Sequence, residues 1–459
     1  MKLNNKGFAI SGVLYSLLIL FVTLFIGVLT LLGTTKFSFD KIKNDIIKKM
    51  ETSLYKEDRL NGADPIIKTG MIPVVISDDG TVKKADVTKE WYNYNQKNWA
   101  NVVTVSSDSR SNYERADAGT LIREEDILTY FVWIPRYRYK LWYVDALDAS
   151  ETKDPTKVHS IDIIFETQNT LKSSGEANEE YLTHPAFTFG SKEVNGIWVG
   201  KFETGYNGAI NATQALDSTP NINKLIIKPN TYAWRGISVS NIHSTIKNMN
   251  ENDNIFGLTE EIHPHMMKNT EWGAVAYLSH SVYGKEAEVF INNFNDYKTG
   301  CGSNSMDQES STTCYNAYGN ATTYTQSTTG NISGIFDMSG GAWEYVMGYS
   351  SETTDAYDLS GFTTDTFPQD KYINKYSSTN LTQYSKRILG DATGEMGPFS
   401  YSDDYYSSWY NDLAIFPNTS GPWVIRGGDL NSKTKAGIFS FSTGNGDANN
   451  AYSFRVVIS

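Results

Sequence analysis

The longest apolar segment of the chain lies near its amino terminus. Residues 7–35 carry no charged side chain, in the run GFAISGVLYSLLILFVTLFIGVLTLLGTT. As a helix they would extend roughly 44 Å at about 1.5 Å per residue, which exceeds the roughly 30 Å hydrocarbon core of a bilayer. We therefore predict one transmembrane helix over 8–35. A cleaved secretory signal is the alternative, but its apolar run usually has only about 7–15 residues.

After residue 35 the continuous apolar run gives way to apolar residues at regular intervals. Ile42, Ile46, Met50 and Leu54 recur every fourth residue between Lys and Asp side chains. This spacing predicts an amphipathic helix that continues the apolar one to residue 55.

Short alternating segments predict strands and helices in the body of the chain. At 130–143, YFVWIPRYRYKLWY places aromatic and aliphatic residues on one side and Arg136, Arg138 and Lys140 on the other, which predicts a half-buried strand bent at Pro135. Further strands are expected at 71–76, 161–166, 196–203 and 224–228, and helices at 237–250 and 270–279. The final 180 residues have little periodicity, but their aromatic content favours packed loops over disorder.

The amino-terminal segment is basic, whereas the rest of the chain is acidic. The full sequence has 459 residues with 52 acidic and 40 basic side chains. Residues 1–60 hold nine basic and five acidic ones, which leaves 31 basic against 47 acidic in the rest. Such an acidic body argues against binding nucleic acid through its phosphates. The length fits roughly two or three domains.

The amino-terminal segment resembles that of type IV pilins and pseudopilins, because a short basic leader ends in Gly7 and is followed by Phe8 and the long apolar run. The resemblance implies a basic leader over 1–7, a pilin-like helix over 8–55, and cleavage between Gly7 and Phe8 by a prepilin peptidase. Gly12 stands where that family usually carries Glu, so a plain membrane anchor remains an alternative to assembly into a filament.

The charges around the apolar run leave its orientation open. Two Lys precede it and five follow it, and this count would place the body in the cytoplasm. Long domains translocate largely regardless of charge, however, and a pilin-like leader implies export. We expect a single-pass protein of the cell membrane that contacts the lipid bilayer through residues 8–35 and has its carboxyl-terminal domain outside the cell.

Three motifs in the carboxyl-terminal part carry a second resemblance. GIFDMSGGAWEYVMG at 334–348, WVIRGG at 423–428 and SFRVV at 453–457 follow one another in an order that resembles the formylglycine-generating-enzyme (sulfatase-modifying factor) family. GIWVGKFETGYN at 196–207 and MMKNTEWGAVAYLS at 266–279 match weaker elements of it. The resemblance implies an α+β, loop-rich, C-type-lectin-like domain over 127–459. Residues 56–126 are then a connector with short strands, either a hairpin-rich module or the edge of the main domain.

We expect the residues of these motifs to stabilise the fold rather than to take part in catalysis. Aromatic residues would lie in the core, glycines would permit a tight backbone course, and arginines would bond carbonyls or a carboxylate. The residues expected in these roles are Trp343, Glu344, Arg426, Gly427, Gly428, Phe454 and Arg455.

Catalysis is not expected. Enzymes of this family use a cysteine pair to activate oxygen with copper, and Ser432 and Gly437 occupy those positions here. We predict no catalytic residue and no cofactor. An acid–base pair of Asp337 and Glu344, a zinc site at His263 and His265, and a calcium ion on unassigned loop oxygens are the alternatives. Cys301 and Cys314 lie 13 residues apart, and we expect a disulfide, which suits an oxidising exterior.

The segment between Arg426 and Arg455 has a composition of its own, with a frame of Gly and aromatic residues that alternates with small polar residues and Tyr. We call residues 426–455 the window. It resembles the variable region of retroelement-diversified proteins, which share the C-type-lectin-like fold. That resemblance implies ligand contacts at Asp429, Asn431, Ser432, Thr434, Ser440, Ser442, Asn445, Asp447, Asn449, Asn450 and Tyr452. A merely solvated surface is the alternative.

The sequence thus favours a membrane-anchored, surface-displayed ligand-binding protein, adhesin- or receptor-like and non-catalytic. Its partner would be a protein or a glycan. A minor pilin or pseudopilin that forms part of a filament is the alternative, and an enzyme of unrecognised chemistry is a third.

Overall fold

The computed structural model describes residues 18–19, 22–23, 61–140, 158–170, 172, 181–351, 360–376, 388–397, 399–402 and 405–459. The chain divides into two compact units, Met1–Glu57 and Asp58–Ser459, and we call the second unit the body. The Gly7–Phe8 bond and most of the expected helix over 8–55 lie outside the described residues. In the part of the chain that is described, no helix is both long enough and apolar enough to cross a bilayer.

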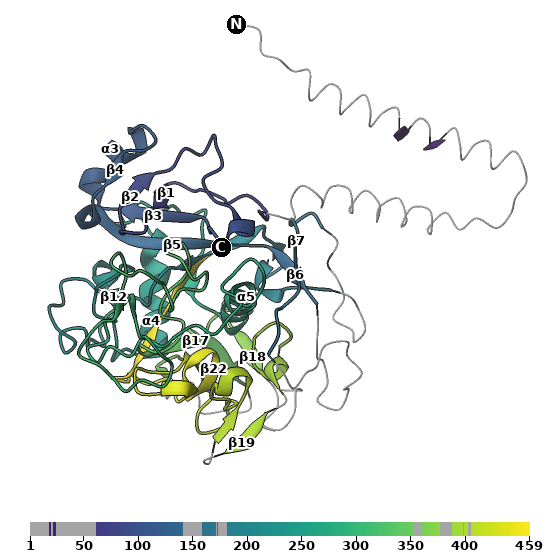
Figure 1. The fold of residues 1–459 in the computed structure, drawn as a ribbon, viewed down its shortest axis with the longest axis vertical. Helices are drawn as coiled ribbons and strands as arrows, with labels where there is room; N and C mark the ends of the chain where they lie inside the picture. Colours follow the sequence, from purple (N-terminus) through teal and green to yellow (C-terminus); the bar gives the residue numbers. More distant parts are fainter. Residues whose placement is uncertain are drawn as a thin grey trace, which may run out of the picture. The chain divides into compact units, whose positions relative to one another are not determined.

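An eight-stranded antiparallel sheet forms one layer of the body (Figure 1). Its order is β14 (Pro264–Met266), β24 (Val456–Ile458), β11 (Gly196–Gly200), β5 (Ile127–Pro135), β3 (Asn101–Val105), β1 (Ile72–Ile76), β2 (Val82–Lys84) and β4 (Leu121–Ile122). Strands from the expected connector therefore pair directly with β5. Residues 72–122 form the edge of the main sheet, which is the second of the two arrangements left open by the sequence.

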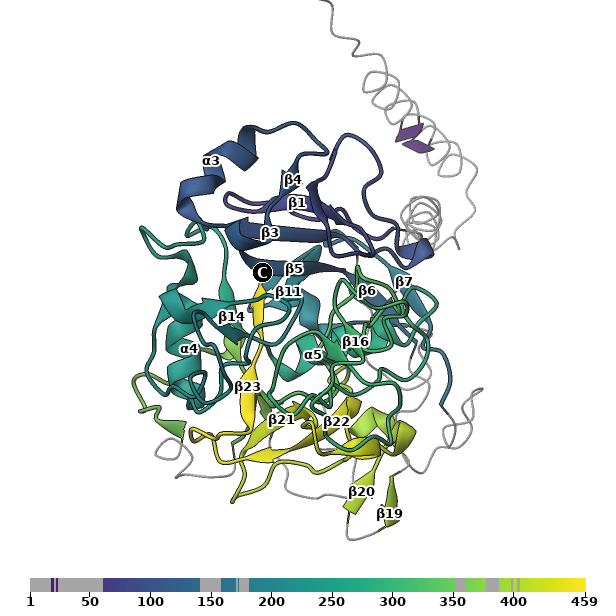
Figure 2. The ribbon, with the colours of Figure 1, turned by 60° about the vertical axis from the view of Figure 1, so that its left-hand side comes forward.

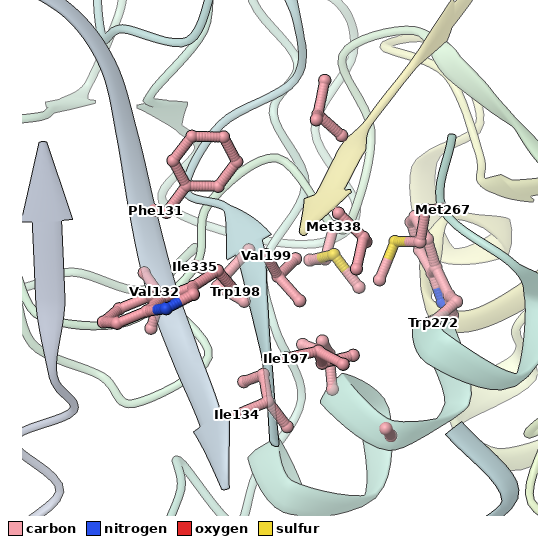
Figure 3. Close-up of a cluster of buried hydrophobic side chains, with 14 of the residues drawn as sticks. Phe131, Val132, Ile134, Ile197, Trp198, Val199, Met267, Trp272, Ile335 and Met338 are labelled. Atoms are coloured by element: carbon pink, nitrogen blue, oxygen red, sulfur yellow. The ribbon is translucent and has the colours of Figure 1, made fainter. Parts of the chain in front are cut away.

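Strand β5 lies inside this sheet, between β3 and β11. All of its residues except Leu128 are buried, so the prediction of a half-buried strand is wrong for residues 130–135. The strand belongs to the hydrophobic core, and Figure 3 shows Phe131, Val132 and Ile134 in one buried cluster with Ile197 and Trp198 of the neighbouring strand β11. The predicted alternation does hold in the next strand, β6 (Tyr137–Tyr139), where both tyrosines are buried and Arg138 is partly exposed.

A second sheet lies toward the opposite end of the body from β1 and β2 (Figure 2). Its order is β18 (Asn374–Tyr376), β17 (Trp343–Ser350), β21 (Trp423–Gly427) and β22 (Gly437–Gly444), and β23 (Tyr452–Phe454) also pairs with β17. Strands β23 and β24 follow each other with only Arg455 between them. The carboxyl-terminal segment therefore belongs to both sheets.

Three α-helices and several small sheets complete the described part of the body. The helices are α3 (Ser107–Arg115), α4 (Val239–Lys247) and α5 (Asn269–Ser279). Helix α5 matches the expected range 270–279 to within one residue, whereas α4 begins two residues later and ends three residues earlier than the expected range 237–250. The small sheets join β6 with β7 (Ile163–Phe165) and β8 (Leu182–Thr183), β9 (Thr188–Phe189) with β10 (Lys192–Glu193), β12 (Gly205–Tyr206) with β13 (Leu225–Ile226), β15 (Cys301–Gly302) with β16 (Asn316–Ala317), and β19 (Ser400–Ser402) with β20 (Tyr405–Ser407). The loop-rich α+β class is confirmed.

Helix α5 is buried along its whole length and begins at a network of charged groups. The Glu271 carboxylate accepts the Lys268 backbone N–H at 2.8 Å and contacts His265 Nε2 at 2.9 Å. Burial opposes ionisation, but His265 and Lys268 lower the pKa of Glu271 to about 2. At Gly273 a Cβ would lie 1.9 Å from the Gly390 carbonyl oxygen, so only glycine fits there.

Arg455 joins the two sheets through buried contacts. Its Nε donates to Glu344 Oε2 on β17 at 3.0 Å, its Nη2 donates to Glu344 Oε1, and its Nη1 donates to the Gly200 carbonyl of β11 at 2.8 Å. Arg455 and Glu344 are both fully buried. A buried guanidinium needs such partners, because its desolvation is otherwise uncompensated.

Two further buried carboxyl groups lie near this pair. Asp337 accepts hydrogen bonds from Gly300 N–H, Asn292 Nδ2 and Gln326 Nε2, at 2.9 to 3.0 Å. Glu203 accepts the Ala342 N–H at 2.8 Å. Burial raises the pKa of Glu203 well above its usual range, and the charges of Glu344 and Asp337 raise it further. The Arg455 guanidinium therefore lies among three buried carboxyl groups and is the cation that offsets their charge.

Replacing Arg455 tests how much this pairing stabilises the body. We expect Arg455→Met to lower the free energy of unfolding at pH 8 by about 3–5 kcal/mol, because it leaves buried carboxylates without their cation. The matched control is Lys375→Met, which breaks the pair with Asp370 (2.6 Å), whose side chains are 43% and 86% exposed. Exposed pairs contribute about 0–1 kcal/mol. Urea unfolding measures both, and equally small losses would contradict the role of Arg455.

Glu203 gives the body a pH dependence of known sign. Its raised pKa means that the folded state keeps the proton to higher pH than the unfolded chain, whose value is near 4.5. Stability from this group is therefore complete below about pH 4.5 and is lost as pH rises toward the folded pKa. We expect Glu203→Gln to gain stability over the wild type between pH 5 and pH 8 in urea unfolding. Glu260→Gln, at an exposed position, serves as the control, and a difference that stays constant with pH would contradict the assignment.

Candidate ligand-binding face

The window spans the edge and one corner of the second sheet. It contributes the end of β21, all of β22 and β23, and the turns between them. β22 lies toward one end of the body, while β1 and β2 lie toward the other (Figures 1 and 2). A face at this end is therefore separate from the edge of the main sheet.

Ser440 is the one predicted contact position that the structure buries completely, at 0% exposure. Strand β22 is paired with β21 on one edge, while Leu413 and Ile415 exchange backbone hydrogen bonds with Phe441 on the other. Residues 437–441 are all buried for this reason. Ser440 cannot contact a ligand, so its assignment is wrong. The other ten positions are at least partly exposed: Asp429, Asn431, Ser432, Thr434, Ser442, Asn445, Asp447, Asn449, Asn450 and Tyr452.

Several of the exposed positions lie on two turns that bond within themselves. In the first, Asp429 Oδ1 accepts the Asn431 N–H at 3.1 Å and the Ser432 hydroxyl at 2.8 Å. In the second, Asn445 Nδ2 donates to Asp447 Oδ2 at 2.7 Å. The polar side chains thus shape their own turns and remain at the surface.

A buried tyrosine holds the second turn to the sheet. The Tyr345 hydroxyl accepts the Gly446 N–H at 3.1 Å and donates to the Asp447 carbonyl at 3.2 Å. Gly446 has φ +91°, and a Cβ there would lie 2.7 Å from the Trp423 ring. This backbone course requires glycine, whereas neighbouring positions project outward.

Tyr297, which the sequence did not identify, adds a partly exposed ring to the face, and the buried Arg235, only 3% exposed, packs against that ring. The Arg235 guanidinium lies 3.8 Å from the centroid of the Tyr297 ring. Its Nη1 donates to the Asn450 carbonyl and its Nη2 to the Ala212 carbonyl at 2.7 Å. The signal present in the sequence is the interleaving of aromatic and basic residues in TYAWRG at 231–236 and NDYKTG at 295–300, far from the window.

The Asp429 carboxylate affects the ionisation of two tyrosines of this face, Tyr297 and Tyr452. Burial raises the pKa of both tyrosines, and the Asp429 carboxylate raises each further. Both rings are half-buried, and Tyr452 packs edge-on against Tyr345 with centroids 5.0 Å apart. Trp343, expected in the core, is also only half-buried, and it pairs in register with Tyr452. The face therefore has partly exposed aromatic rings held between polar turns.

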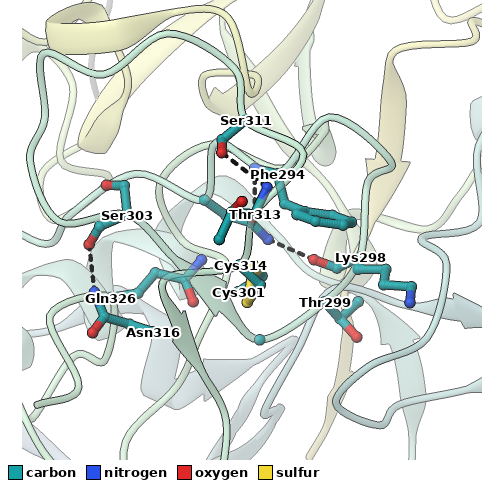
Figure 4. Close-up of a disulfide and its surroundings, with 12 residues drawn as sticks. Phe294, Lys298, Thr299, Cys301, Ser303, Ser311, Thr313, Cys314, Asn316 and Gln326 are labelled. Carbon is teal, nitrogen blue, oxygen red and sulfur yellow. Dashed lines mark hydrogen bonds between the residues drawn. A yellow bond between two sulfur atoms is a disulfide. The ribbon is translucent and has the colours of Figure 1, made fainter. Parts of the chain in front are cut away.

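The disulfide lies close to the segment that carries Tyr297. Cys301 and Cys314 are bonded to each other, and Cys301 begins β15 (Figure 4). Asp337 accepts the Gly300 N–H directly before this cysteine. Closing a loop of this size restricts the unfolded chain by about 3 kcal/mol in the chain-entropy model. The disulfide and Asp337 together fix the segment after Tyr297.

Ser432 and Gly437 stand where formylglycine-generating enzymes carry their cysteine pair, and the second of these positions has no room for a cysteine. A Cβ at Gly437 would lie 2.0 Å from Asp412 Oδ2, so a cysteine does not fit at that position. Asp337 and Glu344 are buried and occupied by the donors described above, which leaves an acid–base pair there without access to a substrate.

No group of three or more His, Cys, Asp or Glu side chains suited to a metal ion occurs among the described residues. His265 bonds Glu271, and His263 stacks on Phe189 with centroids 5.3 Å apart. The two imidazoles therefore have other partners, and among the described residues they do not form a three-ligand metal site.

Comparison with known proteins gives distant structural neighbours only. No family model matches the chain, and no curated protein matches it. Among solved structures, the Major Tropism Determinant I1 variant is 12% identical, with 86% of this chain and 73% of that chain covered and a TM-score of 0.27. The P3c variant of Major Tropism Determinant is 11% identical over the same shares, also with a TM-score of 0.27. At this TM-score the similarity carries no argument about fold or function.

Proposed function

We propose that this protein is a membrane-anchored, surface-displayed, non-catalytic ligand-binding protein of adhesin or receptor type, with a C-type-lectin-like body. The binding surface, which we call the window face, consists of the ten window positions that are at least partly exposed, together with Tyr297, and the buried Arg235 packs against the Tyr297 ring. The observation that carries the proposal is the contrast between this polar, partly aromatic surface and the buried frame beneath it.

Arg426 illustrates how the frame is fixed. Its guanidinium is fully buried and donates to Asn269 Oδ1 (3.2 Å) and to the carbonyls of Asp391 (3.2 Å), Ala392 (3.1 Å) and Ile438 (3.3 Å). Gly428 has φ +80°, and a Cβ there would lie 2.7 Å from Ala436. Such positions do not tolerate exchange, whereas exposed Asn, Asp and Ser side chains do.

The chemistry of the window face suits binding to a varied surface. Tyrosine offers a large contact area with little conformational entropy to lose, and small polar residues adapt their hydrogen bonds. The resemblance of the window to retroelement-diversified variable regions supports the same interpretation. A protein or glycan partner fits this chemistry, and nucleic acid does not, because the body is acidic.

Several features of the full sequence support display outside the cell. The apolar run over 8–35 provides the anchor, and the leader ending at Gly7 provides a site for a prepilin peptidase. Both cysteines of the chain are used in the disulfide, which suits an oxidising exterior and leaves no thiol for copper chemistry. We propose no cofactor. The pilin-like leader also supports a minor pilin or pseudopilin as a second candidate, which immunogold labelling confined to pilus tips would favour.

Ser440 and Ser442 provide a matched pair on one strand. We expect Ser440→Tyr to lower the free energy of unfolding by about 1–3 kcal/mol, because Ser440 is fully buried and a ring there must displace the groups packed around it. Ser442→Tyr lies on the partly exposed stretch and should change it by less than about 0.5 kcal/mol. Urea unfolding compares the two, and similar losses would contradict the division into frame and face.

Resequencing codons 426–455 across many cells of one population tests the proposed function. We expect substitutions at the ten exposed positions, clustered at adenines, with Ser440, Arg426 and Gly428 constant and a near-identical template repeat beside a reverse-transcriptase gene. Codons 239–247 of α4 serve as the internal control. An invariant window without a nearby template would reject a diversified face, and variation spread equally over α4 would reject selection for ligand contact.

A further inference from the structure

We propose a second binding site, for a short neutral saccharide, formed by residues that precede β1 and residues that lie between β2 and β3. A hollow of about 370 Å³ lies there, lined among others by Asn61, Asp64, Ile67, Val87, Glu90 and Trp91. We call it the Trp91 hollow. None of its lining residues belongs to the window, so the inference goes beyond the proposed function and does not depend on it.

One wall of the Trp91 hollow is apolar and rigid. Ile67 and Val87 are 38% and 54% exposed, and the Trp91 ring is half-buried. Trp91 stands edge-on to Tyr92, with centroids 5.1 Å apart and an interplanar angle of 84°. The Tyr92 hydroxyl donates to Asp64 Oδ1 at 2.7 Å, which fixes that ring in turn. A partly exposed indole held in this way offers a flat apolar surface to a ligand.

The other wall supplies hydrogen-bond acceptors. Asp64 and Glu90 line it with exposed carboxylates. Asp64 Oδ1 accepts the Tyr92 hydroxyl at 2.7 Å and Glu90 Oε1 accepts Asn93 Nδ2 at 3.2 Å. An ionised carboxylate has about four acceptor positions, so each group can accept further hydrogen bonds from a ligand. A ligand for this wall must donate several hydrogen bonds.

A pyranose ring combines the two properties. Its C–H groups form an apolar face that packs against an indole, and its hydroxyl groups donate hydrogen bonds around the rim. An anionic ligand fits poorly, because Asp64 and Glu90 are acidic and Lys89 is already paired with Asp86 at 3.0 Å. The volume lies at the lower end of the range of about 300–1,000 Å³ for small-molecule sites, which suits one or two sugar rings.

The test is titration of the full-length protein with cellobiose and chitobiose, in a detergent without a sugar headgroup. Ligand-observed saturation-transfer NMR and calorimetry detect the binding. Sorbitol, which has hydroxyl groups but no ring face, is the control ligand. We expect at least one disaccharide to bind and sorbitol not to bind. Absence of binding by both disaccharides, or equal binding of sorbitol, would overturn the proposal.

Variants connect the binding to the hollow. We expect Trp91→Ala to weaken it by at least about tenfold and Trp91→Phe to retain part of it, because a ring remains. Val87→Arg fills the hollow from an exposed position, so it should abolish binding without lowering the melting temperature. Tyr401→Ala, on the exposed β19 strand, is the matched control and should leave the affinity unchanged. Affinity unaffected by both Trp91→Ala and Val87→Arg would place the saccharide elsewhere and reject the site.

Discussion

The buried pairing of Arg455 with Glu344 is the contact on which the arrangement of the two sheets depends. Arg455 lies between β23 of the small sheet and β24 of the large one, and its three hydrogen-bonding nitrogens reach β17 and β11. Burying a guanidinium is costly unless nearly all its donors are used, which restricts the geometry at this junction. Tyr452 lies on β23, directly before this junction, so the Arg455 contacts also fix the backbone that carries this residue of the window face.

Buried polar contacts of the same kind replace long helices and strands in much of the body. Lys201 Nζ donates to Asn101 Oδ1 at 2.9 Å and to the carbonyls of Ile332 and Gly334 at 2.7 and 2.8 Å. Burial lowers the pKa of Lys201 well below its usual range, yet each of its three donors has an acceptor. The loop before Asp337 is thus joined to Asn101 on β3 through Lys201, the residue that follows β11, although the loop has little regular structure. A loop-rich chain can keep a defined surface when its loops are fixed in this way.

Local patterns in the sequence were sufficient to predict some of the elements, but not the long strands β17 and β22, and not which elements are neighbours. The periodicity of Ile242 and Ile246 predicted α4, and GIWVG predicted β11, because both signals come from adjacent residues. The pairing of β3 with β5, the burial of Ser440 and the approach of Arg235 to Tyr297 each depend on residues far apart in the chain. A single sequence carries no periodic signal for such contacts. The partners of Arg455 could be predicted as carbonyls or a carboxylate for one reason only, namely that a buried guanidinium needs several acceptors wherever it lies.

The two proposed sites differ in what holds them. The window face rests on a frame in which Arg426, Gly428 and Tyr345 fix the backbone, so its side chains can change while the backbone stays in place. The Trp91 hollow has no such division, because Trp91 is both ligand surface and packing partner of Tyr92, and Tyr92 is bonded to Asp64. A change in any of these three would alter the ligand wall and the local packing together. Physical coupling therefore makes the hollow suited to a constant ligand and the window face suited to a changing one.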